Sequence, residues 1–306
     1  MYSQKNFLAP TDYLKEIDKC LSEDRQINYS SASHQDKIYL NERWVINANR
    51  ENPGLNLNVV KNINELPIHI EKFVNNAQKR ARFIAFFSEE KYHAIAFDCC
   101  HIPTKGISII GIEPANSLRP GPCQEIASAC QKLDFSMINT PVSLRILSSN
   151  QQNSIGECII YSLSLVKKMH KESEKLYLLH QKNLNNELNI THKNNNVVIY
   201  PPEADKYLLP LFMKHCQSEK RMNSYLSSPL ADFYENTDKR TYQVSKRSSN
   251  KDDKPLTLHE RFSHYNREQK FGEGEDKDDI KNITASTSIF EKRRYEVNKL
   301  LKKWPF

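Results

Sequence analysis

The chain has 306 residues, 38% of them hydrophobic, and a formal net charge of +7 from 44 Lys and Arg against 37 Asp and Glu. It is long enough for one large domain or two smaller ones with a substantial core. No apolar run approaches the roughly 18 residues of a membrane span, so we expect no stable membrane insertion.

The first 35 residues are expected to form a leader and a linker. Residues 1–10 lack the apolar stretch of a conventional signal peptide. A short amphipathic segment, Tyr13–Leu21, precedes a polar run.

From about residue 36 to 185 the pattern predicts an α+β domain with a central mixed sheet and flanking helices. The expected helices lie at 39–48, 68–79, from Gly121-Pro122 onward, and from Cys158 onward, and the expected strands at 55–60, 82–87, 91–98, 106–115 and 142–147. The predicted core consists of Phe83, Ile84, Phe86, Ile95, Phe97, Ile109, Ile110, Ile112, Ile126, Leu144, Ile146, Leu163 and Val166.

Residues 186–306 are expected to form a second, mainly helical regulatory region. An Asn-rich connection covers 183–196, and helices are predicted at 208–226 and 288–303. The segment 258–270 between them carries His259, Arg261, His264 and Arg267. The polar stretch 236–256 and the Gly-Glu-Asp segment 271–279 are predicted loops.

Three residues in the first region point to nucleophilic catalysis. Cys158 stands at a predicted helix start, where the helix dipole favours the thiolate. His93 and Glu113 lie on neighbouring predicted strands and supply the base and the group that orients it. Taken singly, each has a structural alternative: a buried apolar-like Cys, a half-buried His and a solvated acid.

Seven cysteines, without a paired Cys-x-x-Cys framework, indicate a reducing compartment and no structural zinc site. Cys99, Cys100 and His101 are close in sequence, but adjacent strand residues point to opposite faces, so we expect no metal.

The same residues resemble a known family, the YopJ family of bacterial effectors. Glu113 lies in Ile-Ile-Gly-Ile-Glu-Pro-Ala and Cys158 in Ser-Ile-Gly-Glu-Cys-Ile-Ile-Tyr-Ser-Leu. The separations suit that family, 113 − 93 = 20 and 158 − 113 = 45. The segments 209–221 and 257–262 are similar to later parts of it, so the resemblance spans roughly residues 40 to 300. One residue departs from its pattern: Ile159 follows the Cys where the family usually has Gly. A β-branched residue there is expected either to narrow the acyl pocket or to alter the backbone at the nucleophile.

The resemblance implies a ubiquitin-like-protein-protease type of core. It also implies an acetyltransferase whose Cys takes acetyl from acetyl-CoA and passes it to Ser, Thr or Lys of host proteins, signalling kinases among the candidates. A bacterium would secrete it into the host cytoplasm, where inositol hexakisphosphate activates it. For the chemistry, we expect Gln152 and the Cys158 backbone N–H to stabilise the oxyanion, although Gln152 fits a solvated loop residue equally well.

By the same resemblance, the polyphosphate ligands are expected among the basic residues of the second region, since Lys and Arg bind phosphate oxygens well. The candidates are Lys214, His215, Lys220, Arg221 and Arg261, with Arg50 and Arg267 as further ones. Lys214 also resembles the family's self-acetylated lysine. For any one of these, a solvated charge on a helix face is an equally good interpretation.

Two other classes of function stay open. The same triad could cleave ubiquitin-like conjugates as a cysteine protease. The charge of +7 alone would suit a nucleic-acid binder, but no recognition motif accompanies it, so we expect no nucleic-acid partner.

Overall fold

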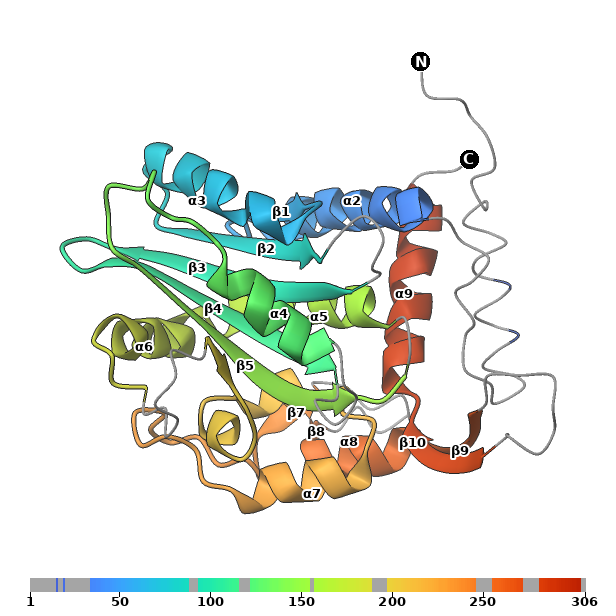
Figure 1. Ribbon diagram of the computed structural model, residues 1–306. Helices are drawn as coiled ribbons and strands as arrows, with labels where there is room; N and C mark the ends of the chain where they lie inside the picture. The colour runs from blue at the N-terminus through green and yellow to red at the C-terminus, as the bar shows by residue number, and fades with distance from the viewer. Residues whose placement is uncertain are drawn as a thin grey trace.

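A six-stranded mixed sheet forms the centre of the molecule in the computed structural model (Figure 1). The structure describes residues 15, 19, 34–87, 93–115, 122–154, 157–188, 197–245, 255–271 and 281–303. The predicted segment Tyr13–Leu21 therefore lies outside the described residues except at Lys15 and Lys19.

The strands follow one another in the sheet in chain order. They are β1 (Leu57–Val60), β2 (Arg80–Phe86), β3 (Ala94–Ile102), β4 (Gly106–Ala115), β5 (Val142–Gln152) and β6 (Val198–Ile199). The β2/β3 and β3/β4 pairs are antiparallel, whereas β1/β2, β4/β5 and β5/β6 are parallel. Gly106 closes the β3–β4 hairpin with φ +127, and a Cβ there would lie 2.4 Å from the Pro141 carbonyl oxygen, so only glycine fits.

Helices cover both faces, which explains why the strands read as nearly continuous apolar runs. On one face lie α2 (His34–Glu51), α5 (Cys158–Lys171) and α6 (Ser173–Leu184); on the other lie α3 (Leu66–Asn75) and α4 (Pro122–Gln131). Successive strand residues alternate between the two cores, as with Phe83 and Ile84. All thirteen predicted core residues are buried.

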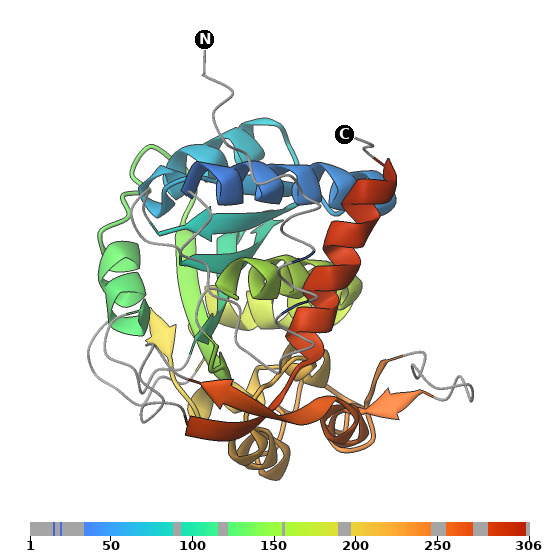
Figure 2. The ribbon, with the colours of Figure 1, turned by 90° about the vertical axis from the view of Figure 1, so that its right-hand side faces the viewer.

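The C-terminal region packs against the α5 face. Its elements are the 3₁₀ turns at Glu203–Lys206 and Pro210–Met213, α7 (Glu219–Ser227), β7 (Gln243–Ser245), β8 (Leu256–Thr257), α8 (Leu258–Tyr265), β9 (Asn266–Phe271), β10 (Lys281–Ser286) and α9 (Ser288–Lys303). β7 with β8 and β9 with β10 form two small antiparallel sheets. Figure 2 shows α9 beside α5 and reaching α2, and the three helices share one apolar core.

Several sequence-based boundaries were wrong: the helix predicted at 68–79 is Leu66–Asn75, and the strand predicted at 91–98 is Ala94–Ile102. The segment 208–226 is not one helix: Pro210 starts a 3₁₀ turn, and Ser218 caps α7 by accepting a hydrogen bond from the Arg221 N–H. β5 runs on to Gln152 rather than ending at Leu147. The segment 258–270, for which the sequence predicts no element, forms α8 up to Tyr265 and then β9.

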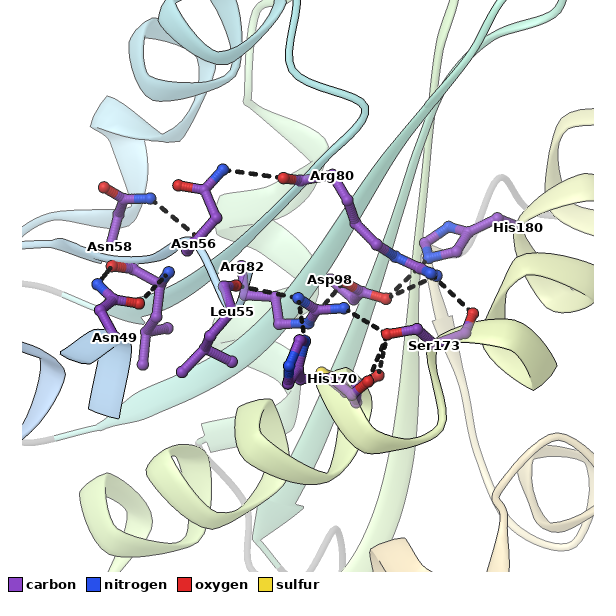
Figure 3. Close-up of polar contacts among 12 residues, drawn as sticks. Asn49, Leu55, Asn56, Asn58, Arg80, Arg82, Asp98, His170, Ser173 and His180 are labelled. Carbon is purple, nitrogen blue, oxygen red and sulfur yellow. Dashed lines mark hydrogen bonds and ion pairs between the residues drawn. The ribbon is translucent and has the colours of Figure 1, made fainter. Parts of the chain in front are cut away.

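Asp98 of β3 is the centre of a buried charged network (Figure 3). Its carboxylate lies 3.1 Å from Arg80, 3.2 Å from Arg82 and 3.2 Å from His180. Both arginines also donate to Ser173, at 2.7 Å from Arg80 and 2.9 Å from Arg82. The network thus fastens the α5–α6 junction to the sheet.

Of the helices in the described ranges, none combines the length and apolar character needed to cross a membrane.

Candidate active site

The three predicted catalytic residues lie at the ends of three elements that the fold brings together. His93 immediately precedes β3, Glu113 is near the end of β4, and Cys158 is the first residue of α5. Two hydrogen bonds fix this arrangement: the Phe87 N–H donates to the His93 carbonyl at 2.9 Å, and the Ser162 hydroxyl of α5 donates to the Ala94 carbonyl at 2.9 Å.

Glu113 holds the imidazole of His93. The His93 Nε2 to Glu113 Oε2 distance is 2.6 Å, and the second carboxylate oxygen accepts the Ala115 N–H at 2.7 Å. Glu113 is completely buried, whereas the His93 side chain is 16% exposed. With Nε2 facing the carboxylate, the other ring nitrogen, Nδ1, is left for the thiol.

Cys158 completes the constellation through a side-chain hydrogen bond with His93. Burial lowers the pKa of His93, but the charge of Glu113 and the hydrogen bonds with Cys158 and Glu113 outweigh it, so the pKa is raised well above 6.5. An imidazole held in its charged form beside a thiol is the arrangement that stabilises a nucleophilic thiolate.

The raised pKa of His93 gives a direct test. In Glu113→Gln, the carboxylate charge is lost while the burial remains, so the pKa of His93 is expected to fall to its ordinary value or below. The His93 imidazole resonances, followed by NMR between pH 5 and pH 9, would give the titration midpoint of His93 in the parent protein and in Glu113→Gln. An unchanged midpoint in Glu113→Gln would mean that Glu113 does not hold the imidazole.

Gln152 is buried at the end of β5 and is not a solvated loop residue. A bulge in β5, where Asn150 has a φ of 49, shifts the register so that Gln152 pairs with Ala115. One hydrogen of its amide donates to the Ser154 carbonyl at 2.7 Å. The other is available, so a role in binding the oxyanion stays a prediction.

Ile159 is 7% exposed and packs in the apolar core on the α5 face. The side chain that replaces the expected Gly is therefore accommodated as a core residue beside the nucleophile.

A basic pocket of about 490 Å³ lies at the other end of α5, between that helix and the C-terminal region. It is lined by Ser164, Lys167, Lys168, Lys171, Leu211, Lys214, His215, Val244, Arg261, Tyr265, Ser288, Glu291, Lys292 and Tyr295. Of the predicted polyphosphate ligands, Lys214, His215 and Arg261 are brought together here.

The other four candidates are not among the lining residues. Arg221 pairs with both carboxylate oxygens of Asp205, and its Nε donates to the Ser149 carbonyl at 2.9 Å, so this guanidinium is committed to the fold. Lys220 and Arg50 have exposed side chains. Arg267 is also exposed and donates to the Asn266 carbonyl. These four therefore lie outside the lining of this pocket, and their part in binding a polyphosphate stays a prediction.

Four lysines of the pocket were missed: Lys167, Lys168 and Lys171 on α5, and Lys292 on α9. Burial, then the charges of Lys214, Arg261 and Lys292, lower the pKa of Lys168 well below its usual value. Burial, then Arg261, Lys292 and Lys171, lower the pKa of Lys214 to about 7. Cations that repel one another in a half-enclosed cavity indicate a site for a polyanion.

The chain is similar to a known family of proteins. The family model described as YopJ Serine/Threonine acetyltransferase matches residues 11–299. The Serine/threonine-protein acetyltransferase YopJ of Yersinia pestis is 32% identical over 192 residues, which cover 60% of this chain and 62% of the relative. YopJ of Yersinia pseudotuberculosis gives the same figures. The match thus spans less than two thirds of these curated relatives.

Solved structures extend the likeness in fold to nearly the whole chain. A structure of AvrA delL154 with IP6 and CoA has a TM-score of 0.72 and 24% identity, and covers 97% of this chain and 99% of its own. HopZ1a in complex with IP6 and CoA has a TM-score of 0.69 and 17% identity, and covers 96% and 93%. The predicted α+β fold with a central mixed sheet is confirmed. Since the family model spans nearly the full length, the chain belongs to the YopJ Serine/Threonine acetyltransferase family.

Proposed function

We propose that this protein is an effector acetyltransferase. It moves acetyl from acetyl-CoA through an acetyl-Cys158 intermediate to Ser, Thr or Lys of host proteins, signalling kinases among them, after secretion by a bacterium into the host cytoplasm. One observation carries the proposal: in a chain of this family, the Glu113–His93 pair meets a thiol at the first residue of a buried helix.

The residues support a two-step transfer. His93 takes the proton of Cys158, and the thiolate attacks the thioester carbonyl while Gln152 and the Cys158 N–H stabilise the oxyanion. The carbon–sulfur bond to coenzyme A breaks, and His93 returns the proton to the departing thiolate. An acceptor hydroxyl or amine then gives its proton to His93 and attacks the acetyl-Cys, which restores the thiol.

We further propose that inositol hexakisphosphate binds the basic pocket and activates the enzyme. The AvrA and HopZ1a structures were solved with IP6, and the repulsion between Lys168 and Lys214 is what a polyphosphate would relieve. Before the ligand binds, a pKa of about 7 leaves much of the Lys214 amine neutral at neutral pH, which suits an acceptor of self-acetylation.

The decisive experiment incubates the full chain with acetyl-labelled acetyl-CoA and inositol hexakisphosphate in host-cell extract. Label on the chain and on host proteins supports the transferase. Cleavage of ubiquitin-like conjugates without any labelling would favour the alternative, a cysteine protease with the same triad.

Polyphosphate binding should depend on pH through Lys214. Bound phosphates raise the pKa of Lys214 from about 7, so binding above pH 7 takes up a proton. Affinity for inositol hexakisphosphate is expected to fall between pH 7 and pH 9, by up to about tenfold per pH unit for each lysine that takes up a proton. Calorimetric titration measures this dependence.

Lys214→Met supplies the control, because the ligand's own ionisation is the same for both proteins. The variant is expected to bind more weakly at pH 7 and to show a flatter pH dependence. Equal slopes for the two proteins would contradict the assignment of Lys214 to the site.

A further inference from the structure

Gln217, from the C-terminal region, holds the segment that leads into the nucleophile. Its side-chain oxygen accepts the Asn153 N–H at 2.7 Å, the Ser154 N–H at 2.9 Å and the Ser154 hydroxyl at 3.1 Å. The Gln217 N–H also donates to the Gln151 carbonyl at 2.9 Å. Gln217 is completely buried, so these bonds are shielded from competing water.

Arg293 of α9 holds the same segment from its other end. Its guanidinium lies 2.7 Å from a carboxylate oxygen of Glu157, and the two side chains are only 2% and 0% exposed. Glu157 directly precedes Cys158, and its carbonyl accepts the Tyr161 N–H at 3.0 Å in the first turn of α5. Moving Arg293 would leave a buried carboxylate next to the reactive thiol.

Both residues belong to short segments that also line the basic pocket. Lys214 and His215 precede Gln217 by two or three positions, and Lys292 directly precedes Arg293. The segments are joined: His215 contacts the Ser288 hydroxyl at 3.1 Å, and the Ser286 N–H donates to the Gln217 carbonyl at 3.3 Å. The Tyr161 hydroxyl of α5 donates to the His215 carbonyl at 2.6 Å. The segments around Gln217 and Arg293 therefore line the pocket and also contact the residues that precede Cys158.

We propose that Gln217 and Arg293 are positioning residues for Cys158. The inference rests on the proposed acetyl transfer and adds the residues that hold the segment before the nucleophile in place. A displacement of about 1 Å at a reacting group is enough to cost on the order of 100-fold in rate, so a modest loosening of these contacts has a large effect on the chemical step.

The test compares variants that remove each contact with variants that keep it. Gln217→Met and Arg293→Met remove the contacts at similar volume. Arg293→Lys keeps the charge, and Gln217→Glu keeps the acceptor oxygens. Gln217→Glu removes the side-chain N–H₂ group, but this group donates no hydrogen bond to any of the described residues. Lys299→Met is the control on the same helix, since Lys299 pairs with Glu51 of α2, away from the nucleophile.

Four quantities are measured for each full-length variant with inositol hexakisphosphate present: kcat for acetyl transfer, KM for acetyl-CoA, the rate of Cys158 alkylation by iodoacetamide from peptide masses, and the thermal midpoint. The Met variants are expected to lose about 10- to 100-fold in kcat, with KM within about threefold, and to alkylate Cys158 at an altered rate while still folded. The conservative variants should recover most of kcat, and Lys299→Met should match the parent protein.

Wild-type kcat and alkylation in both Met variants would overturn the inference. So would a lower thermal midpoint with unchanged kcat per folded molecule, which is the signature of a purely structural role. If the parent protein transfers no acetyl, the proposed function fails, and the alkylation rates still decide whether Gln217 and Arg293 position the thiol.

Discussion

Replacing Cys158 with Ala is expected to reduce acetyl transfer by on the order of 10⁴-fold or more, because Cys158 is the nucleophile of the proposed covalent route and the thiol that contacts His93. Mixing the variant with labelled acetyl-CoA and inositol hexakisphosphate should leave no label on the chain, whereas the parent protein carries label that neutral hydroxylamine partly removes, as it does from thioesters. Polyphosphate affinity should stay unchanged, since the pocket does not include Cys158.

Cys100→Ala is the matched control for this result. Cys100 is also a buried free thiol, but burial raises its pKa to about 11 and it lies within β3. The control is expected to label as the parent protein does. Acetylated acceptor protein formed by Cys158→Ala at the parent rate would rule out the acetyl-Cys intermediate and point to direct transfer.

Asp98→Ala is expected to lower the free energy of unfolding by about 3–5 kcal/mol, the largest loss of stability among the substitutions proposed for this protein. The substitution leaves Arg82, which is only 1% exposed, without the carboxylate that balances its charge, and it also unpairs Arg80 and His180. Urea unfolding followed by circular dichroism measures the change. Glu187→Ala, which breaks an exposed pair with Lys182, should leave the midpoint nearly unchanged.

The dependence of this effect on pH follows from the direction of the pKa shift. Burial raises the pKa of Asp98, but the hydrogen bond with His180 and the charges of Arg82 and Arg80 bring it below 3.8. The stabilisation is therefore fully present above pH 3.8 and is lost as the pH falls below that value. If Asp98→Ala and the parent protein unfold at equal urea concentration at pH 7, the network is not stabilising.

The central sheet and the triad were predictable from the sequence because their signals are local. Phe83 and Ile84 stand in an apolar strand, and His93, Glu113 and Cys158 each have a reactive side chain near the end of a predicted element. Their convergence required only that neighbouring strands pair and that the helix pack on them.

The residues that the sequence did not reveal have partners far along the chain. Lys168 lies on α5 beside Lys167, where a lysine is normally solvated, and the packing of the C-terminal region leaves it only 8% exposed. The pairing of Arg221, a predicted phosphate ligand, with Asp205 is not visible in the sequence because the chain between them folds back through two 3₁₀ turns. The proposed roles of Gln217 and Arg293 likewise depend on contacts with residues 153–157, which are distant in the sequence.

The placement of Arg293 on α9 also has a consequence for biosynthesis. The ribosome synthesises His93, Glu113 and Cys158 well before residues 288–303. The nascent chain therefore contains the Cys158 thiol before the α9 residues that pack near it. If Arg293 positions Cys158 as proposed, chains that end before α9 lack its contact with Glu157, and a cut between Cys158 and α9 that releases the helix would lower the activity without changing His93, Glu113 or Cys158.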